Sequence, residues 1–333
     1  MMRKKSILIL VLFLGTLFHF GCKKKPMLQV IKESNTLAKQ WLYNNFRRKG
    51  IFVYLYNPKK RRFSRKNNMI RQLMASRLIA ELSNTEPRWK ALHQKNLKFI
   101  LKYWYKEEGN IGYIYYNKKS KLGASAMFLR TLVFSPFFAK YDTECKKLIN
   151  GIEFLMAADG SFQPLYKKPP NTRKYDNPRM IERLNYFYTG EAILALVEYA
   201  IKNDDRRVLY MAMKAQDFYL DRYVTNMKKY YYPAYVPWHT QSLTKLYKVT
   251  KEKKYADAIF IMNNELLKIQ DRTKFIGRFY HPKFPQYGSP HSASDSVYLE
   301  GLAYAYEIAK LVGDKKHEKK YLAAIDIGAR NLD

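Results

Sequence analysis

The chain has 333 residues, of which 47% are hydrophobic and 27% are charged. This length and composition give one large domain or two small ones with a full core, and they exclude wholesale disorder. The formal net charge of +33 comes from 61 basic and only 28 acidic residues, so we expect an anionic partner such as lipid head groups or an anionic glycan. No basic-aromatic nucleic-acid motif is present, and we expect no nucleic-acid partner.

The first residues have the layout of a secretory signal. A basic start, Arg3-Lys4-Lys5, precedes an apolar run from Ile7 to Phe18 that is too short for a comfortable membrane span. Phe20-Gly21-Cys22 then resembles a bacterial lipobox, which implies lipidation of Cys22. The alternatives are an uncleaved anchor or a plain signal peptide.

These features predict a signal peptide over residues 1–21 and a lipidated linker over residues 22–27. Lys23-Lys24-Lys25 would lie against anionic head groups and add to the affinity of the acyl chains for the membrane. Loss of the three cations before Cys22 would lower the net charge from +33 to +30. We therefore expect a membrane-anchored lipoprotein of the bacterial cell envelope, either periplasmic or at the outer membrane.

Hydrophobic residues recur with a helical period along the rest of the chain. Two short aromatic stretches, Gly50–Tyr56 and Gly109–Asn117, look like strand inserts. The expected helices are Leu28–Phe46, Asn68–Leu82, Trp89–Tyr105, Leu122–Phe137, Thr143–Met156, Gly190–Ile201, Arg206–Leu220, Val236–Val249, Lys254–Ile269, Val297–Leu311 and Lys315–Leu332.

The last three helical hairpins align with one another at an offset of roughly 50 to 60 residues. Each has an apolar helix, a polar turn rich in Lys and Asp, and a second helix that contains Ala. Repeated hairpins stack because none of them buries its apolar face alone. We predict an all-α fold, an (α/α) toroid of five to six helical hairpins with short strand-like inserts, as a single domain over residues 28–333. An open helical solenoid is the alternative.

Four short motifs carry a family resemblance: Tyr188-Thr-Gly-Glu-Ala192, Asp159-Gly-Ser-Phe162, Trp238-His-Thr-Gln241 and Glu300-Gly301-Leu302. With the hairpin pattern, they resemble the six-hairpin (α/α)-toroid superfamily. That class contains glucuronyl C5-epimerase C-terminal domains, N-acylglucosamine 2-epimerases, unsaturated glucuronyl hydrolases and cellulase-like glycosidases. The resemblance implies a substrate groove at the end where the inner helices begin, although the fold hosts many chemistries.

Three residues are the candidates for catalysis. Glu191 and Glu300 each stand beside a Gly at an expected helix start, where backbone amides favour a negative charge. His239 follows Trp238 at another expected start. Carboxylates, a His and aromatic rings around one concavity are what proton transfer on a sugar requires. The alternative is structural: the carboxylates cap helices or pair with an Arg, and the His is only hydrogen-bonded.

A wider set is expected to bind substrate on the same rim. The basic loops Lys59–Lys66 and Lys167–Arg179 favour a groove or membrane face that holds an anionic polymer. The spacing of His281, His291 and Asp295 matches no metal signature, so we expect neither a metal nor a cofactor. The substrate-binding candidates are Arg71, Asp159, Tyr188, Trp238, Gln241, His291, Asp295 and Tyr298.

Three functional hypotheses follow. The first is an envelope-anchored lipoprotein that acts on anionic cell-surface carbohydrate as a hydrolase, lyase or epimerase. The second is a non-catalytic lipoprotein that binds envelope glycan or assists export through the same groove. The third is a scaffold docked to the membrane by charge. An enzyme needs the candidate acids and the His near one point, whereas a binding protein needs only aromatic rings and cations.

Overall fold

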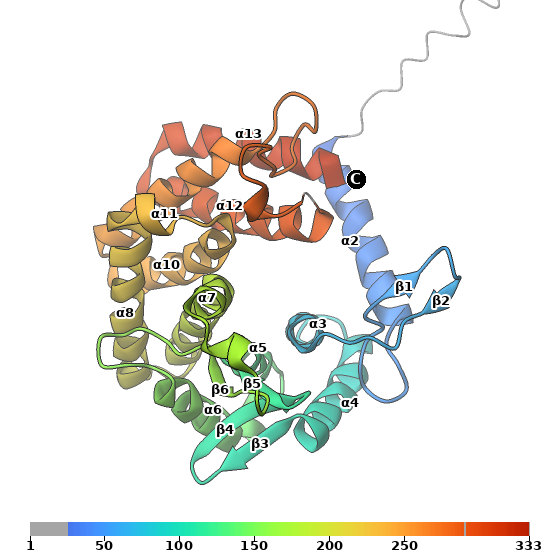
Figure 1. Ribbon diagram of the computed structural model, residues 1–333. Coiled ribbons are helices and arrows are strands. Elements are labelled where there is room, and N and C mark those ends of the chain that lie inside the picture. Colours follow the sequence, from blue (N-terminus) through green and yellow to red (C-terminus); the bar gives the residue numbers. More distant parts are fainter. Residues whose placement is uncertain (1–25, 290, 333) are drawn as a thin grey trace, which may run out of the picture.

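The fold is an all-α toroid, seen as a ring of helices in Figure 1. The computed structural model describes residues 26–289 and 291–332. The predicted signal peptide and Cys22 lie outside these residues. The inner helices are α3 (Met69–Leu82), α5 (Leu122–Val133), α7 (Pro178–Asn203), α10 (Val236–Thr250) and α12 (Ser292–Val312). The outer helices are α2 (Met27–Asn44), α4 (Arg88–Tyr103), α6 (Asp142–Phe154), α8 (Arg206–Leu220), α11 (Lys253–Leu266) and α13 (Lys315–Leu332), and a short α9 spans Met227–Tyr230.

The inner helices pack side by side in chain order. α5 lies between α3 and α7, and α10 lies between α7 and α12. Each inner helix also packs on the outer helix that follows it, which makes five hairpins. α2 is left over from these hairpins and lies on the outside of the ring between α13 and α4, where its Leu42 packs with Ile79 of α3 and Trp89 of α4 (Figure 1). The predicted toroid of five to six hairpins is therefore confirmed.

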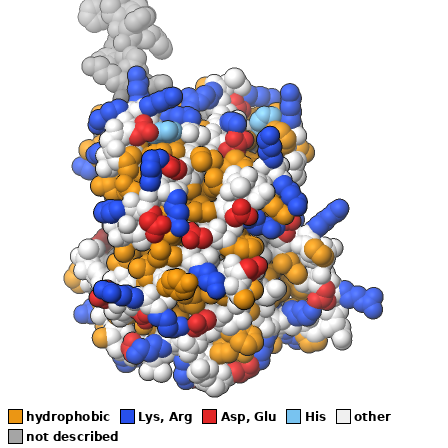
Figure 2. All heavy atoms as spheres, turned by 90° about the vertical axis from the view of Figure 1, so that its left-hand side faces the viewer, with side chains coloured by type: hydrophobic (Ala, Val, Ile, Leu, Met, Phe, Trp, Pro, Cys, Tyr) orange, Lys and Arg blue, Asp and Glu red, His pale blue; other side chains and the backbone are white. Residues whose placement is uncertain are grey.

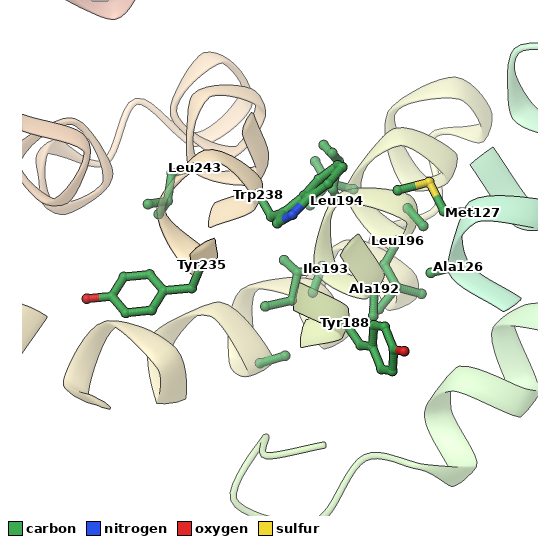
Figure 3. Close-up of a cluster of buried hydrophobic side chains, with 14 of the residues drawn as sticks. Ala126, Met127, Tyr188, Ala192, Ile193, Leu194, Leu196, Tyr235, Trp238 and Leu243 are labelled. Carbon is green, nitrogen blue, oxygen red and sulfur yellow. The ribbon is translucent and has the colours of Figure 1, made fainter. Parts of the chain in front are cut away.

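Sequence pattern explains which helices face inward. Every residue of α5 is buried, as expected of a helix that is apolar nearly all round and packed on both sides. In Figure 3, apolar side chains of α5, α7 and α10 meet in the interior, among them Met127, Leu194 and Leu243.

The outer helices bury one face and expose the other. On the wall formed by α8 and α11, cations and acids are interspersed (Figure 2). Lys254 pairs with Asp217 across these two helices, and Lys253 pairs with Asp257 within α11. Among the described residues, no helix is long and apolar enough to cross a membrane.

Two small antiparallel sheets lie between the helices. β3 (Tyr105–Glu108), β4 (Ile111–Tyr116), β5 (Lys119–Lys121) and β6 (Leu165–Lys167) form one sheet in that order. Tyr115 of β4 pairs with Ser120 of β5, which fixes the register immediately before α5. β1 (Tyr56–Asn57) and β2 (Arg62–Phe63) form a separate hairpin. The expected insert Gly109–Asn117 thus contains β4, whereas only Tyr56 of Gly50–Tyr56 belongs to a strand. The larger sheet leads the chain to the start of an inner helix.

Candidate functional site

A cavity of about 370 Å³ lies where the beginnings of the inner helices converge. Side chains from α3, α7, α10 and α12 line it, together with Lys121 from the residue before α5. This is the end of the ring at which the sequence predicts a groove. Six of the candidate site residues meet here: Arg71, Tyr188, Glu191, Trp238, His291 and Tyr298.

Glu191 is the only carboxylate among the described residues that line this cavity. Its side chain is 2% exposed, and its Oε2 atom has no hydrogen-bond partner in the described part of the chain. Burial raises its pKa from 4.5 to about 8, against the opposing charges of Arg130 and Lys121. A buried, unpartnered carboxyl group is costly, so its position at a cavity indicates a function.

A glycine makes room for this carboxyl group. A Cβ atom on Gly123 of α5 would lie 2.1 Å from Oε2 of Glu191 and 2.5 Å from Cδ1 of Tyr188. Any side chain at position 123 would displace both groups. The close approach of α5 to α7 therefore sets the positions of the acid and of the neighbouring ring.

Cations and aromatic rings surround the acid. Lys121 lies with Nζ 5.7 Å from the ring centroid of Tyr188, and burial lowers the pKa of this ammonium group. Arg71 and Arg183 also line the cavity, and neither forms an ion pair within the described residues. Burial, with the charge of Glu191, raises the pKa of Tyr188. The cavity combines three cations with one acid that tends to be protonated, which suits an anionic ligand.

The predicted placement of Glu191 and Glu300 at helix starts is wrong. Glu191 lies inside α7, which begins at Pro178, and Glu300 lies inside α12, which begins at Ser292. The amides around them are already bonded within the helix, so the N-terminal dipole does not explain either group. The Asn177 side chain caps α7, accepting from the N–H of Arg179 at 2.9 Å.

Glu300 does not line the cavity. It lies nearer a layer of charges further along the inner helices, where Arg130 and Glu198 form a buried ion pair, with Nε to Oε2 at 2.6 Å and Nη2 to Oε1 at 3.0 Å. The protein around Glu300 displaces water from its carboxyl group and raises its pKa, against the charges of Arg130 and Arg77, while part of the residue still reaches solvent. The structure does not bring Glu300 into the cavity beside Glu191, and a catalytic role for it stays a prediction.

His239 and Gln241 do not line the cavity. His239 is 1% exposed; its Nδ1 atom lies 3.1 Å from Nε2 of Gln216 and its Nε2 atom lies 3.3 Å from Oγ1 of Thr189. Burial lowers its pKa to about 3, so the ring is neutral. Gln241 is likewise buried. Trp238 alone of this motif lines the cavity.

The two Asp candidates also lie elsewhere. Asp159 is exposed in a turn, where its Oδ1 atom accepts from the N–H of Ser161 at 2.9 Å. Asp295 is buried and accepts from Nε of Arg278 at 2.6 Å and from the N–H of Phe279 at 3.0 Å. It thereby holds the loop before α12 against that helix. Neither residue lines the cavity.

Sequence reasoning did not single out Lys121, Arg183 or Gly123 as site residues. Lys121 and Gly123 flank the first residue of α5, a helix start that the hydrophobic period did locate. Arg183 lies in the first turns of α7, between the predicted basic loop Lys167–Arg179 and the helix predicted from Gly190. The Asn177-Pro178 pair is a helix-start signal that would have placed it on the inner helix.

Comparison with known proteins supports the fold. No protein-family model matches the chain, and no curated protein matches its sequence. Among solved structures, a D-mannose isomerase superposes with a TM-score of 0.62 at 12% identity, covering 88% of this chain and 85% of that chain. A GH76 α-mannanase from Bacteroides thetaiotaomicron superposes with a TM-score of 0.60 at 10% identity, covering 92% of this chain and 83% of that chain. At these identities the likeness shows the shared (α/α)-toroid architecture.

Proposed function

We propose that this protein is a carbohydrate-active enzyme whose cavity takes an anionic sugar unit, and that Glu191 transfers the proton. The observation that carries the proposal is the buried carboxyl group of Glu191, with its unpartnered Oε2 atom and its pKa of about 8. A group that titrates close to neutral pH is well matched to proton transfer. The toroid fold is shared with a sugar isomerase and a mannanase, which supports the substrate class.

The presence of a single carboxylate in the cavity wall favours proton abstraction over hydrolysis of a glycosidic bond. Hydrolysis of a glycosidic bond generally uses two carboxyl groups on either side of that bond. The described cavity wall supplies only Glu191. We therefore favour abstraction of the proton on the carbon next to a sugar carboxylate. Return of a proton to the opposite face of that carbon gives epimerisation, and departure of the group on the adjacent carbon gives elimination.

The neighbouring cations have a defined role in this scheme. Proton abstraction next to a carboxylate places a second negative charge on the substrate. Lys121, Arg71 and Arg183 lie around the cavity and would stabilise that charge. The rings of Tyr188 and Trp238 offer apolar faces for the pyranose. An anchor at Cys22 would present this cavity to carbohydrate of the bacterial cell envelope.

The proposal is tested by proton exchange. The full chain is incubated with uronic-acid oligosaccharides in D₂O, and loss of the ring proton next to the carboxylate is followed by NMR. Wild type should exchange this proton, and Glu191→Gln should bind the sugar while losing at least 100-fold in rate. Glu153→Gln removes an exposed carboxylate that pairs with Arg207 on the outer wall, and it should match wild type. Binding without exchange by wild type would instead support the non-catalytic lipoprotein.

A further inference from the structure

Two further cavities continue outward from the central one. A cavity of about 170 Å³ shares Asn68 and Lys121 with the central cavity. A third, of about 710 Å³, shares Asn67 and Tyr116 with the second. The three therefore adjoin one another in a row that leads from Glu191 across the start of α3 and past β4. We call the second and third together the outer groove.

The outer end of this groove has an aromatic floor. Trp104, at the end of α4, is 5% exposed and packs edge-on against Tyr116 of β4, with ring centroids 5.8 Å apart. Phe99 packs edge-on against Trp104 from within α4 at 5.1 Å. Trp104 is therefore a buried support, and the partly exposed ring of Tyr116 packed against it is the one that offers an apolar face to a sugar.

Buried hydrogen bonds hold the wall of the groove in place. The side chain of Gln72 accepts from the N–H of Phe52 at 2.9 Å and donates to its carbonyl at 2.8 Å. It also donates to Oδ1 of Asn67 at 2.9 Å. Asn96 of α4 donates to the carbonyl of Gly50 at 2.8 Å. The loop that carries the cations is therefore fixed before any ligand arrives.

The charge of the outer groove is of one sign. Among its described lining residues there is no Asp or Glu. None of its cations forms an ion pair within the described part of the chain, whereas the cations of α11 are paired with acids. The cations that line it are Arg47, Lys49, Arg65, Lys66, Lys119 and Lys121.

We propose that this outer groove binds further units of an anionic polysaccharide whose reacting unit occupies the central cavity. The inference rests on the proposed function, because it assigns Glu191 to one end of the bound chain. A concave surface with a recessed aromatic floor fits an extended glycan, whereas a membrane needs a surface that protrudes. Carboxylate or sulfate groups at intervals along the glycan pair with the cations, and a sugar face lies on Tyr116, which the buried Trp104 supports.

The test compares chain lengths. Uronic-acid oligosaccharides of two and eight units, prepared from alginate and from polygalacturonate, are titrated calorimetrically into the full chain. Wild type should bind the octamer at least 10-fold more tightly than the dimer. The triple variant Arg47→Gln/Lys49→Gln/Arg65→Gln should lose this preference and keep the dimer affinity within about 2-fold. Equal affinities of wild type for the two lengths would overturn the proposal.

A matched control removes the same charge elsewhere. Lys310→Gln/Lys316→Gln/Lys319→Gln changes three exposed cations around the turn between α12 and α13, at the opposite end of α12 from the cavity. This variant should keep the octamer preference. An equal loss of that preference in both triple variants would mean that net charge alone causes it.

Binding to phosphatidylglycerol vesicles is measured in parallel, to test whether the groove docks to a membrane. If the groove variant loses vesicle binding while wild type shows no length preference, the groove is a membrane face and the proposal is wrong.

Different results would contradict the proposed proton transfer by Glu191 and the proposed glycan site in the outer groove. Proton exchange that depends on Glu191 but is independent of chain length leaves the proposed function standing and overturns the outer site. Absence of both binding and exchange with every oligosaccharide contradicts the two together. The melting temperature of each triple variant should lie within a few degrees of wild type, since all six positions are exposed.

Discussion

At the scale of single residues, the buried carboxyl group of Glu191 lowers stability at high pH, and we propose that the same group transfers the substrate proton. Its pKa rises from 4.5 to about 8 on folding because burial disfavours the charged form. The favourable contribution of the protonated group is complete below pH 4.5, and it is lost as the pH rises through about 8. Above that pH the folded state holds a buried charge that the unfolded chain exposes to water.

The first prediction follows from this linkage. Glu191→Gln should be more stable relative to wild type at pH 9 than at pH 5, by a few kcal/mol at about 1.4 kcal/mol per pKa unit. Urea unfolding at the two pH values measures the difference. Glu153→Gln, on the outer wall, should show no such change. A Glu191→Gln effect that is equal at both pH values would mean that the carboxyl group is not buried as described.

A second prediction concerns the buried pair of Arg130 and Glu198. Burial would raise the pKa of Glu198, and pairing with Arg130 more than offsets this, so its pKa is lowered. Glu198→Gln should destabilise the protein by about 3–5 kcal/mol because it leaves the Arg130 charge buried alone. The double variant Arg130→Met/Glu198→Leu should recover most of that loss in urea unfolding. A double variant as unstable as the single one would show that packing, rather than the unpaired charge, is responsible.

Residue type and helix position predicted only in part which side chains meet at the cavity. Tyr188 and Glu191 are three residues apart in one helix, so they share a face and both reach the cavity. Trp238 and His239 are adjacent, and a turn of about 100° separates them, so only Trp238 reaches it. The rotation of each helix about its axis depends on its neighbours in the ring, and a single sequence does not contain that information.

At the scale of helices, the positions of the elements were predictable, whereas the starts of α7 and α12 were not. α8, α10, α11 and α13 begin or end within a few residues of their predicted bounds, because apolar period and polar turns mark them clearly. α7 begins 12 residues before the predicted Gly190. Its first turns carry Met180, Leu184 and Phe187 at helical spacing, but they directly follow a basic, proline-rich run that indicates a loop. The missed turns carry Arg183, one of the cavity cations.

Close approach between α5 and α7 gives the third prediction. Gly123→Ala should destabilise the fold by roughly 1–3 kcal/mol, because the new Cβ overlaps the Glu191 carboxyl group and the Tyr188 ring. It should also abolish proton exchange by moving Glu191. Both effects are measured on the same preparation, by urea unfolding and by NMR.

The matched control is Gly151→Ala on α6. Its Cβ would lie 2.3 Å from the carbonyl oxygen of Gly112 in β4, away from the cavity. This variant should lose similar stability while keeping its exchange rate under folding conditions. If both variants lose exchange rate in proportion to their loss of stability, Gly123 has no specific role in positioning Glu191.

At the scale of the whole molecule, the net charge of +33 acts on stability and on binding in opposite directions. Repulsion among cations destabilises the compact state, and salt screens it over a Debye length of about 10 Å at 0.1 M. The same screening weakens attraction for an anionic glycan.

The fourth prediction is therefore a pair of opposite salt effects. Raising NaCl from about 20 mM to about 300 mM should increase the melting temperature in calorimetry, and it should weaken octamer binding at least 10-fold. A melting temperature that falls with salt would mean that attractive ion pairs outweigh the repulsion. The ring architecture itself was predictable from repeated hairpins, whereas the concentration of unpaired cations in one groove required the three-dimensional arrangement.

The central claim is that Glu191 exchanges the substrate proton, and the pH dependence of that exchange tests it most directly. Wild type should show a rate that rises with pH and levels off above an inflection near 8, as the carboxyl group becomes ionised. Lys121→Met removes a cation that lowers the pKa of Glu191, so its inflection should move to higher pH. A rate that is independent of pH, or that survives in Glu191→Gln, would contradict the account.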